Sequence, residues 1–337
     1  MILRRPAPPH VRSAHPCRRL GTVARGQFTV LNSDAASRCI LWAGVISLGS
    51  GCAGLTMPAE APHRHTLLAP PLVVHSDVSL SREAPLIQEL VALRAEIART
   101  LDLPDSQVPI TLYVFQDRDL YRRYVRLHYP QLPDRRAFFV ADRGRAAVYG
   151  YLGDQLAEDL RHELTHAVLH TTLGELPLWL DEGLAEYFEV PSAADGLHNL
   201  HLRKLQAGLA AGWQPSLARL QQKQQVSEMD AADYREAWAW TYFLLRGPPP
   251  VQAALRDYLR QRQNSRELAM TNTGRLALTV NNPEAELCEF ISSLAPADQG
   301  PQDGIQAGLA PAVRQAADGA GDHGVALGRR TSSPAPR

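Results

Sequence analysis

Two short segments, HELTH at residues 162–166 and WLDEGLAEYFE at residues 179–189, decide how this chain folds and what chemistry it can carry. His162 and His166 stand four residues apart, and on a helix two such side chains project within about 40° of each other. Both imidazoles can therefore reach one metal ion. Zn²⁺ lowers the pKa of a coordinated water toward about 7, and Glu163 lies where a carboxylate can take a proton from that water. The first segment thus predicts a zinc hydrolase site.

The second segment predicts a helix with an acidic side and an apolar side. Pro177 suits the first turn of a helix, and Glu182 and Glu186 then share one face. The opposite face carries four large apolar residues: Leu180, Leu184, Tyr187 and Phe188. Fifteen residues separate His166 from Glu182. This is enough to end the first helix near Gly174, turn, and bring the second helix back beside it.

Together these segments resemble the gluzincin metallopeptidases, and the run from Leu72 to Phe188 is similar to the peptidase-MA-like bacterial proteins of the DUF1570 type. The resemblance implies that His162, His166 and Glu182 are the metal ligands and that Glu163 is the general base. The implied fold is α+β and zincin-like. It has an N-terminal mixed α/β lobe with a short sheet, a mainly helical C-terminal lobe, and the HExxH helix at the cleft between them.

Two further roles rest on the same resemblance. Glu186 stands where related enzymes place a carboxylate that orients a ligand histidine. The stretch 234–243 is similar to the family's helix after the metal pair, and Tyr234 is the predicted donor to the oxyanion that forms when water attacks a carbonyl. Aromatic residues at helical spacing are also typical of cores, which is the alternative interpretation of Tyr234.

Two nearby positions limit the type of site. A metzincin is excluded, because its third ligand would fall at Thr172. His170 lies one turn beyond the motif and is interpreted as a surface histidine, with a ligand or a residue supporting a ligand as the alternative.

Three functions stay open at this point. The favoured one is a zinc metallopeptidase that acts on peptides or unfolded proteins, because a site kept only for structure has no use for Glu163. A zinc hydrolase of a non-peptide amide or ester would use the same residues. A binding protein of the cell envelope that keeps the zincin fold without turnover is the third.

Composition excludes other classes. The 337 residues are 45% hydrophobic and 21% charged, enough for one medium or two small cores. Because 35 basic residues balance 35 acidic ones, the net charge gives no indication of nucleic acid as a partner. Nothing suggests a Ser or Cys nucleophile, and Cys288, the one cysteine after the leader, is interpreted as a small core residue.

Residues 1–52 are predicted to be a leader. The apolar run at 39–48 is too short to span a bilayer but has the length of a signal-peptide core. Small residues at 49–51 precede Cys52, as in a bacterial lipobox, so Cys52 is the predicted lipidation site. This lipid would anchor an exported protein in the bacterial cell envelope. A cleaved signal that leaves a periplasmic or secreted protein is the second interpretation, and a short buried helix is the third.

The rest of the chain divides by composition into a linker at 53–71, the α/β lobe at 72–153, the zinc-binding helical lobe at 154–294, and a disordered tail at 295–337. Periodicity predicts strands near 72–75, 108–115, 138–140 and 146–151, and helices over 82–101, 117–128, 197–210, 230–245, 251–262 and 283–294.

The elements around the HELTH helix carry three more expectations. Residues 146–151 form the candidate strand for hydrogen-bonding an extended substrate, with an ordinary sheet strand as the alternative. Asp154 is the expected N-cap of the HELTH helix. The apolar stripe of this helix, turned away from the histidines, consists of Leu156, Leu160, Leu164 and Val168.

Overall fold

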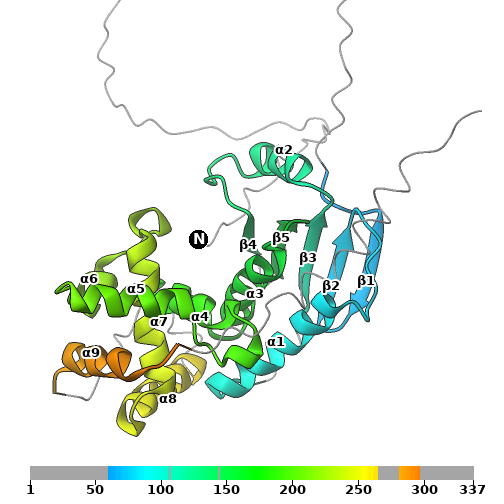
Figure 1. The fold of residues 1–337 in the computed structure, drawn as a ribbon. Coiled ribbons are helices and arrows are strands. Elements are labelled where there is room, and N and C mark those ends of the chain that lie inside the picture. Colours follow the sequence, from blue (N-terminus) through cyan, green and yellow to red (C-terminus); the bar gives the residue numbers. More distant parts are fainter. Residues whose placement is uncertain (1–59, 105, 107, 143–144, 265–280, 297–337) are drawn as a thin grey trace, which may run out of the picture. The chain divides into compact units, whose positions relative to one another are not determined.

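The computed structural model describes residues 60–104, 106, 108–142, 145–264 and 281–296. The predicted leader with Cys52, and the predicted tail from residue 297 onward, lie outside these residues. Within the described part of the chain, no helix is long and apolar enough to cross a membrane. The chain is of the mixed α/β class, with one five-stranded sheet and several helices (Figure 1).

The strands are ordered β1 (His65–Ala69), β2 (Leu72–Ser76), β3 (Ile110–Phe115), β5 (Arg145–Tyr151) and β4 (Ala137–Asp142). The pairs β2–β3 and β3–β5 are parallel, whereas β1–β2 and β4–β5 are antiparallel. The strand predicted to bind an extended substrate, β5, is therefore paired on both sides, and its backbone groups are already used. The edge strand next to it is β4.

The first strand corrects the predicted linker. β1 lies inside the segment 53–71, and all five of its residues pair with β2. Three of the five are exposed, so the strand has little apolar periodicity of its own. It depends on pairing with β2, which sequence periodicity does not report.

The two faces of the sheet are covered differently because side chains alternate along each strand. Val148 faces the larger core together with α1 (Pro85–Leu101) and α3 (Leu156–Leu173). The neighbouring Tyr149 faces a second, aromatic core under α2 (Arg118–His128).

The helix that carries HELTH, α3, agrees with its predicted pattern except at its start. All four residues of the predicted apolar stripe are buried, and Gly174 ends the helix with φ 77°. Asp154 does not cap it, because α3 begins only at Leu156, whose N–H donates to Gly153 O at 3.1 Å. The residue in the N-cap position is Gln155, and its side chain makes no capping hydrogen bond.

The next helix, α4 (Leu178–Glu189), packs between α3 and α7 (Ala231–Arg246). Every residue from Trp179 to Glu189 is buried, so the predicted acidic side faces protein as the apolar side does. Gly183 permits this arrangement: a Cβ there would lie 2.3 Å from Thr241 Oγ1 and 2.4 Å from Ala237 O. Its lack of a side chain allows the close approach of α7.

The remaining helices are α5 (Asn199–Ala210), α6 (Leu217–Gln222), α8 (Pro249–Asn264) and α9 (Pro283–Ser293), with short 3₁₀ turns at Ser192–Ala194 and Val226–Glu228. The periodicity located all of these helices except α6, which is too short to show a period. Cys288 on α9 is only partly buried, and this burial raises the pKa of its thiol.

Candidate metal centre

The hairpin of α3 and α4 brings together His162, His166 and Glu182, which we call the metal cluster. The two Nε2 atoms are 3.3 Å apart, and Glu182 Oε2 lies 3.5 Å from His162 Nε2 and 3.6 Å from His166 Nε2. Ligands of a tetrahedral metal ion at about 2.0–2.2 Å are separated from one another by about 3.3–3.6 Å. The three donor atoms thus have the spacing that one such ion requires.

The environment of Glu182 also fits a cation. Its side chain is 1% exposed, and neither carboxylate oxygen has a hydrogen-bond partner among the described residues. The contacts to the two histidines are too long for hydrogen bonds. A buried carboxylate without hydrogen-bond partners is costly, and a bound cation removes that cost.

The charges inside the cluster shift its pKa values in opposite directions. Burial lowers the pKa of His166, but Asp181 and Glu182 outweigh burial and raise the pKa to about 9. The pKa of His162 is also raised, because Glu182 and Glu189 outweigh burial. Burial raises the pKa of Glu182, yet the two histidines lower it overall. A metal ion binding here would therefore displace protons from the imidazoles.

Each histidine of the metal cluster has a carboxylate beside its other ring nitrogen. Glu189 Oε2 lies within hydrogen-bond distance of His162 Nδ1, at 2.8 Å. Asp181 Oδ2 lies 3.2 Å from His166 Nδ1 in an ion-pair contact without a hydrogen bond, and its hydrogen-bond partner is His170 Nε2. Such carboxylates fix the ring orientation of a ligand histidine. The predicted residue for this role, Glu186, instead contacts His201 at 2.6 Å.

The reason for this correction is the register of the two helices. Glu182, Glu186 and Glu189 follow each other at helical spacing on one face of α4, so their spacing alone cannot say which of them meets His162.

His170 also differs from its favoured interpretation. Its side chain is 6% exposed and lies 2.9 Å from Asp181 Oδ2, so it supports a carboxylate inside the protein.

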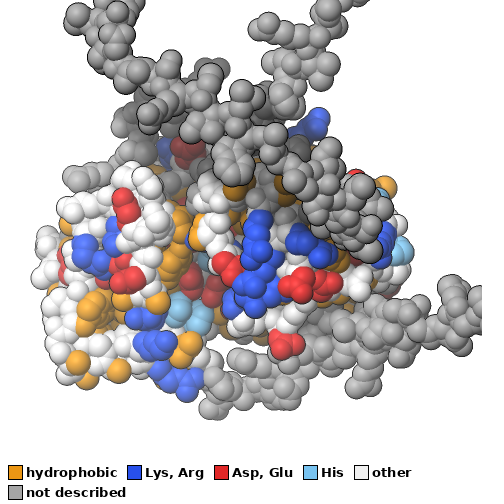
Figure 2. All heavy atoms as spheres, turned by 90° about the horizontal axis from the view of Figure 1, so that it is seen from above, with side chains coloured by type: hydrophobic (Ala, Val, Ile, Leu, Met, Phe, Trp, Pro, Cys, Tyr) orange, Lys and Arg blue, Asp and Glu red, His pale blue; other side chains and the backbone are white. Residues whose placement is uncertain are grey.

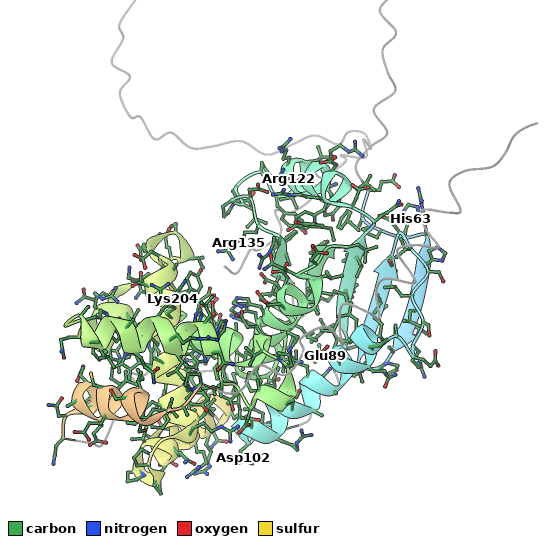
Figure 3. All side chains as sticks on the ribbon, viewed as in Figure 1. His63, Glu89, Asp102, Arg122, Arg135 and Lys204 are labelled. Atoms are coloured by element: carbon green, nitrogen blue, oxygen red, sulfur yellow. The ribbon has the colours of Figure 1, made fainter. Side chains whose placement is uncertain are left out.

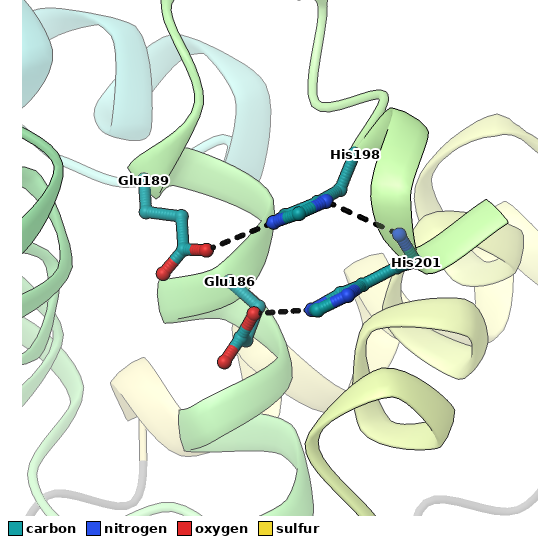
Figure 4. Close-up of side chains that lie close together, drawn as sticks. All are labelled: Glu186, Glu189, His198 and His201. Atoms are coloured by element: carbon teal, nitrogen blue, oxygen red, sulfur yellow. Dashed lines mark hydrogen bonds and ion pairs between the residues drawn. The ribbon is translucent and has the colours of Figure 1, made fainter. Parts of the chain in front are cut away.

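Four side chains beyond the metal cluster form a second group, which we call the paired cluster: Glu186, Glu189, His198 and His201. The carboxylates come from α4 and the histidines from the start of α5 (Figure 4). Asp181, Glu189, His198 and His201 were not predicted as site residues. The spacing of His198 and His201, three apart at a helix start, was the available signal for the last two.

Tyr234 and Arg135 lie near the metal cluster. Tyr234, half-buried on α7, has a pKa of about 12, raised by burial and by the charge of Glu182. Burial lowers the pKa of the Arg135 guanidinium, but the nearby Tyr234, Glu163 and Glu182 together raise this pKa by more. Figure 3 locates Arg135 just before β4. The arginine was missed because nothing in its local sequence distinguishes it from its neighbour Arg136.

The metal cluster is not sealed from solvent. The side chain of His162 is 16% exposed, and Glu163 is 8% exposed. From above, histidine side chains reach the surface next to acidic side chains (Figure 2).

In the comparisons with known proteins, no family model matches the chain, and the search of curated proteins found no match.

Proposed function

We propose that this protein is a zinc-dependent metallopeptidase with a zincin-like fold. The observation that carries this proposal is the triangle of donor atoms in the metal cluster, with sides of 3.3, 3.5 and 3.6 Å around a buried carboxylate that has no hydrogen-bond partner among the described residues. Two imidazoles and one carboxylate, with a fourth position left for water or substrate, are typical of catalytic zinc sites. Zinc held there supplies a Lewis acid that makes water nucleophilic near neutral pH.

The residues around the cluster divide the remaining work. Glu163 takes a proton from the attacking water and passes it to the leaving nitrogen. Its charge acts on both His162 and Arg135, which is consistent with a place among the reacting groups. Tyr234 and Arg135 donate hydrogen bonds to the oxyanion that develops on the substrate carbonyl.

The substrate backbone has a candidate partner in the edge strand β4. β4 is paired only with β5 in the described sheet, so its other edge can accept an extended peptide by strand addition. The strand also adjoins the metal cluster, because the rings of Phe139 and His166 lie 6.4 Å apart. A peptide paired with β4 would pass beside the metal. This favours a peptide over a small ester as the substrate.

The test compares Glu163→Gln with Glu158→Gln in the full-length protein. Glu158 is exposed in the first turn of α3 and pairs with Arg136 at 3.6 Å, so it is the same chemical change on the same helix. Both variants should bind one zinc ion per chain. Glu163→Gln should lose about 10²–10⁴-fold in the rate of cleavage of an unstructured, fluorogenic protein substrate, and Glu158→Gln should keep the wild-type rate.

Equal cleavage by wild type and Glu163→Gln would contradict the proposal. So would a zinc-loaded wild type that cleaves no unstructured protein. Screening the same two proteins against ester and non-peptide amide substrates separates the peptidase from a hydrolase of another class.

A further inference from the structure

Among the described residues, Glu189 links the paired cluster to the metal cluster by a hydrogen bond. Glu189 Oε2 lies 2.8 Å from His162 Nδ1, and the other oxygen, Oε1, lies 3.2 Å from His198 Nε2. Glu186, by contrast, lies against His201. Two His–Glu pairs therefore stand side by side (Figure 4). The pair that contains Glu189 continues by a hydrogen bond to His162.

We propose that His198 is a positioning residue for the metal centre, acting on His162 through Glu189. This proposal rests on the proposed metal site but not on the substrate. The start of α5 is thereby part of the metal centre, although its side chains do not reach the metal cluster themselves.

The contacts form a series from His201 through His198 and Glu189 to His162. The donor and acceptor in each step follow from the first step. The backbone N–H of His201 can only donate, so His198 Nδ1, at 3.3 Å, accepts and carries no proton. The proton of the His198 ring is therefore on Nε2, which faces Glu189 Oε1 at 3.2 Å. The second oxygen accepts from His162 Nδ1. This leaves His162 Nε2 as the nitrogen that binds the metal.

Burial makes this chain effective. The side chains of Glu189 and His198 are 10% and 17% exposed, and the ring of Trp238 lies 6.4 Å from that of His198. Hydrogen bonds shielded from water hold their partners more firmly than exposed ones do. Glu189 is therefore held from both sides, and its orientation sets that of the His162 ring.

The paired cluster is arranged for hydrogen bonds rather than for a second ion. His201 Nε2 and Glu186 Oε2 are 2.6 Å apart, well below the tetrahedral ligand separation of about 3.3 Å. The rings of His198 and His201 stack with centroids 3.7 Å apart and planes 5° apart. Two imidazoles on one ion diverge, as the rings of His162 and His166 do, with centroids 4.9 Å apart and planes at 74°.

The experiment uses His198→Asn and the matched control His201→Gln in the full-length protein. Asparagine keeps the acceptor that caps α5 but is too short to reach Glu189. His201→Gln alters the neighbouring pair, which in the described part of the chain has no hydrogen bond or ion pair to His162, His166 or Glu182. Zinc affinity is measured by competition with a chromophoric chelator, and the geometry of the site by the visible spectrum of the cobalt(II) form.

His198→Asn should weaken zinc binding about 10–100-fold, as removal of an outer metal-site partner does, and should shift the cobalt bands while the helical circular dichroism stays unchanged. His201→Gln should leave the affinity and the spectrum at wild-type values. Three results would overturn the proposal: wild-type zinc affinity and cobalt spectrum in His198→Asn, equal losses in both variants, or two zinc ions in wild type of which His198→Asn loses one.

The outcome is separable from that of the proposed function. If His198→Asn binds zinc as wild type does while Glu163→Gln still abolishes cleavage, the positioning role is wrong and the peptidase stands. If His198→Asn shifts the cobalt spectrum and no protein substrate is cleaved, the positioning role stands without the peptidase. Failure of the wild type to bind any zinc would overturn both.

Discussion

The metal cluster and the paired cluster use the same residue types and both take their carboxylates from α4, yet their geometries differ. In the metal cluster the three donor atoms stand 3.3–3.6 Å apart, and the carboxylate oxygens of Glu182 have no hydrogen-bond partner among the described residues. In the paired cluster each carboxylate has its own imidazole, and Glu186 approaches His201 to 2.6 Å. Residue type and burial alone therefore do not identify a metal site. The distances between donors, and whether the donors are already satisfied, distinguish the two.

The contrast arises from where the histidines come from. His162 and His166 lie one turn apart on α3, so both rings point at the same spot beside Glu182. His198 and His201 lie at the N-terminus of α5, where the backbone N–H of His201 uses one ring nitrogen of His198. The start of α5 thereby fixes the tautomer of His198, whereas in a metal site the bound ion determines the tautomer of its histidine.

The largest expected effect on zinc binding comes from replacing one carboxylate in each cluster. Glu182→Gln should lower zinc affinity by more than the roughly 10–100-fold typical of an outer carboxylate, because it removes a ligand, and cleavage should fall to background. Glu186→Gln, one turn further along α4, should stay within a few-fold of wild type. Zinc content after dialysis against a chelator, together with cleavage rates, measures both. Retention of zinc by Glu182→Gln would break the distinction.

Tyr234 should give the next largest effect. Tyr234→Phe removes a hydroxyl that lies near Glu182 and Arg135, so kcat should fall about 10²–10³-fold at unchanged zinc content. The control is Tyr242→Phe, on the same helix but packed against Trp238 and Phe290. An unchanged kcat in Tyr234→Phe would leave the tyrosine with a packing role only.

Much of this centre could be predicted, because it depends on local spacing. The positions of His162, Glu163 and His166 on one helix, the end of that helix at Gly174, and its apolar stripe all follow from a 3.6-residue period. The outer carboxylate was misplaced by one turn, to Glu186 rather than Glu189. That choice depends on how α3 and α4 slide past each other, and no single-helix pattern contains this information.

The parts that could not be predicted depend on contacts distant in sequence. His198 reaches Glu189 across the connection between α4 and α5, which contains a 3₁₀ turn at Ser192–Ala194. Arg135 meets Tyr234 from a segment almost one hundred residues away. Strand β1 exists through its pairing with β2. In each case the local sequence has no distinguishing pattern, and the contact arises from the tertiary structure.

A smaller effect tests whether the two ligand histidines are supported equally. Glu189 has a pKa lowered to about 2, because hydrogen bonds to His162 and His198 outweigh burial, so it is ionised at neutral pH. Glu189→Gln and Asp181→Asn should each lower zinc affinity about 10–100-fold. The same chelator competition measures both. If only Asp181→Asn lowers the zinc affinity, the contact between Glu189 and His162 does not contribute to zinc binding.

The smallest predicted effect separates the two nitrogens of His198. Its Nδ1 caps α5 and its Nε2 contacts Glu189. His198→Ala loses both functions, and loss of an N-cap typically lowers the free energy of unfolding by about 1 kcal/mol. His198→Asn restores the cap alone, so its stability should return close to that of wild type. For a domain of about 150–250 residues, 1 kcal/mol corresponds to about 2–4 °C in Tm.

The melts have to be recorded in excess chelator, because a bound ion stabilises the folded state by mass action and would mix the two functions. Under these conditions the order of Tm should be wild type, then His198→Asn, then His198→Ala, with His201→Gln close to wild type because its backbone N–H is unchanged. Adding zinc should then widen the gap between wild type and His198→Asn, because only the wild type keeps the contact to Glu189. If His198→Asn melts as low as His198→Ala without metal, the capping role assigned to Nδ1 is wrong. The assignment of the His198 ring proton to Nε2, which follows from that cap, would then be unsupported.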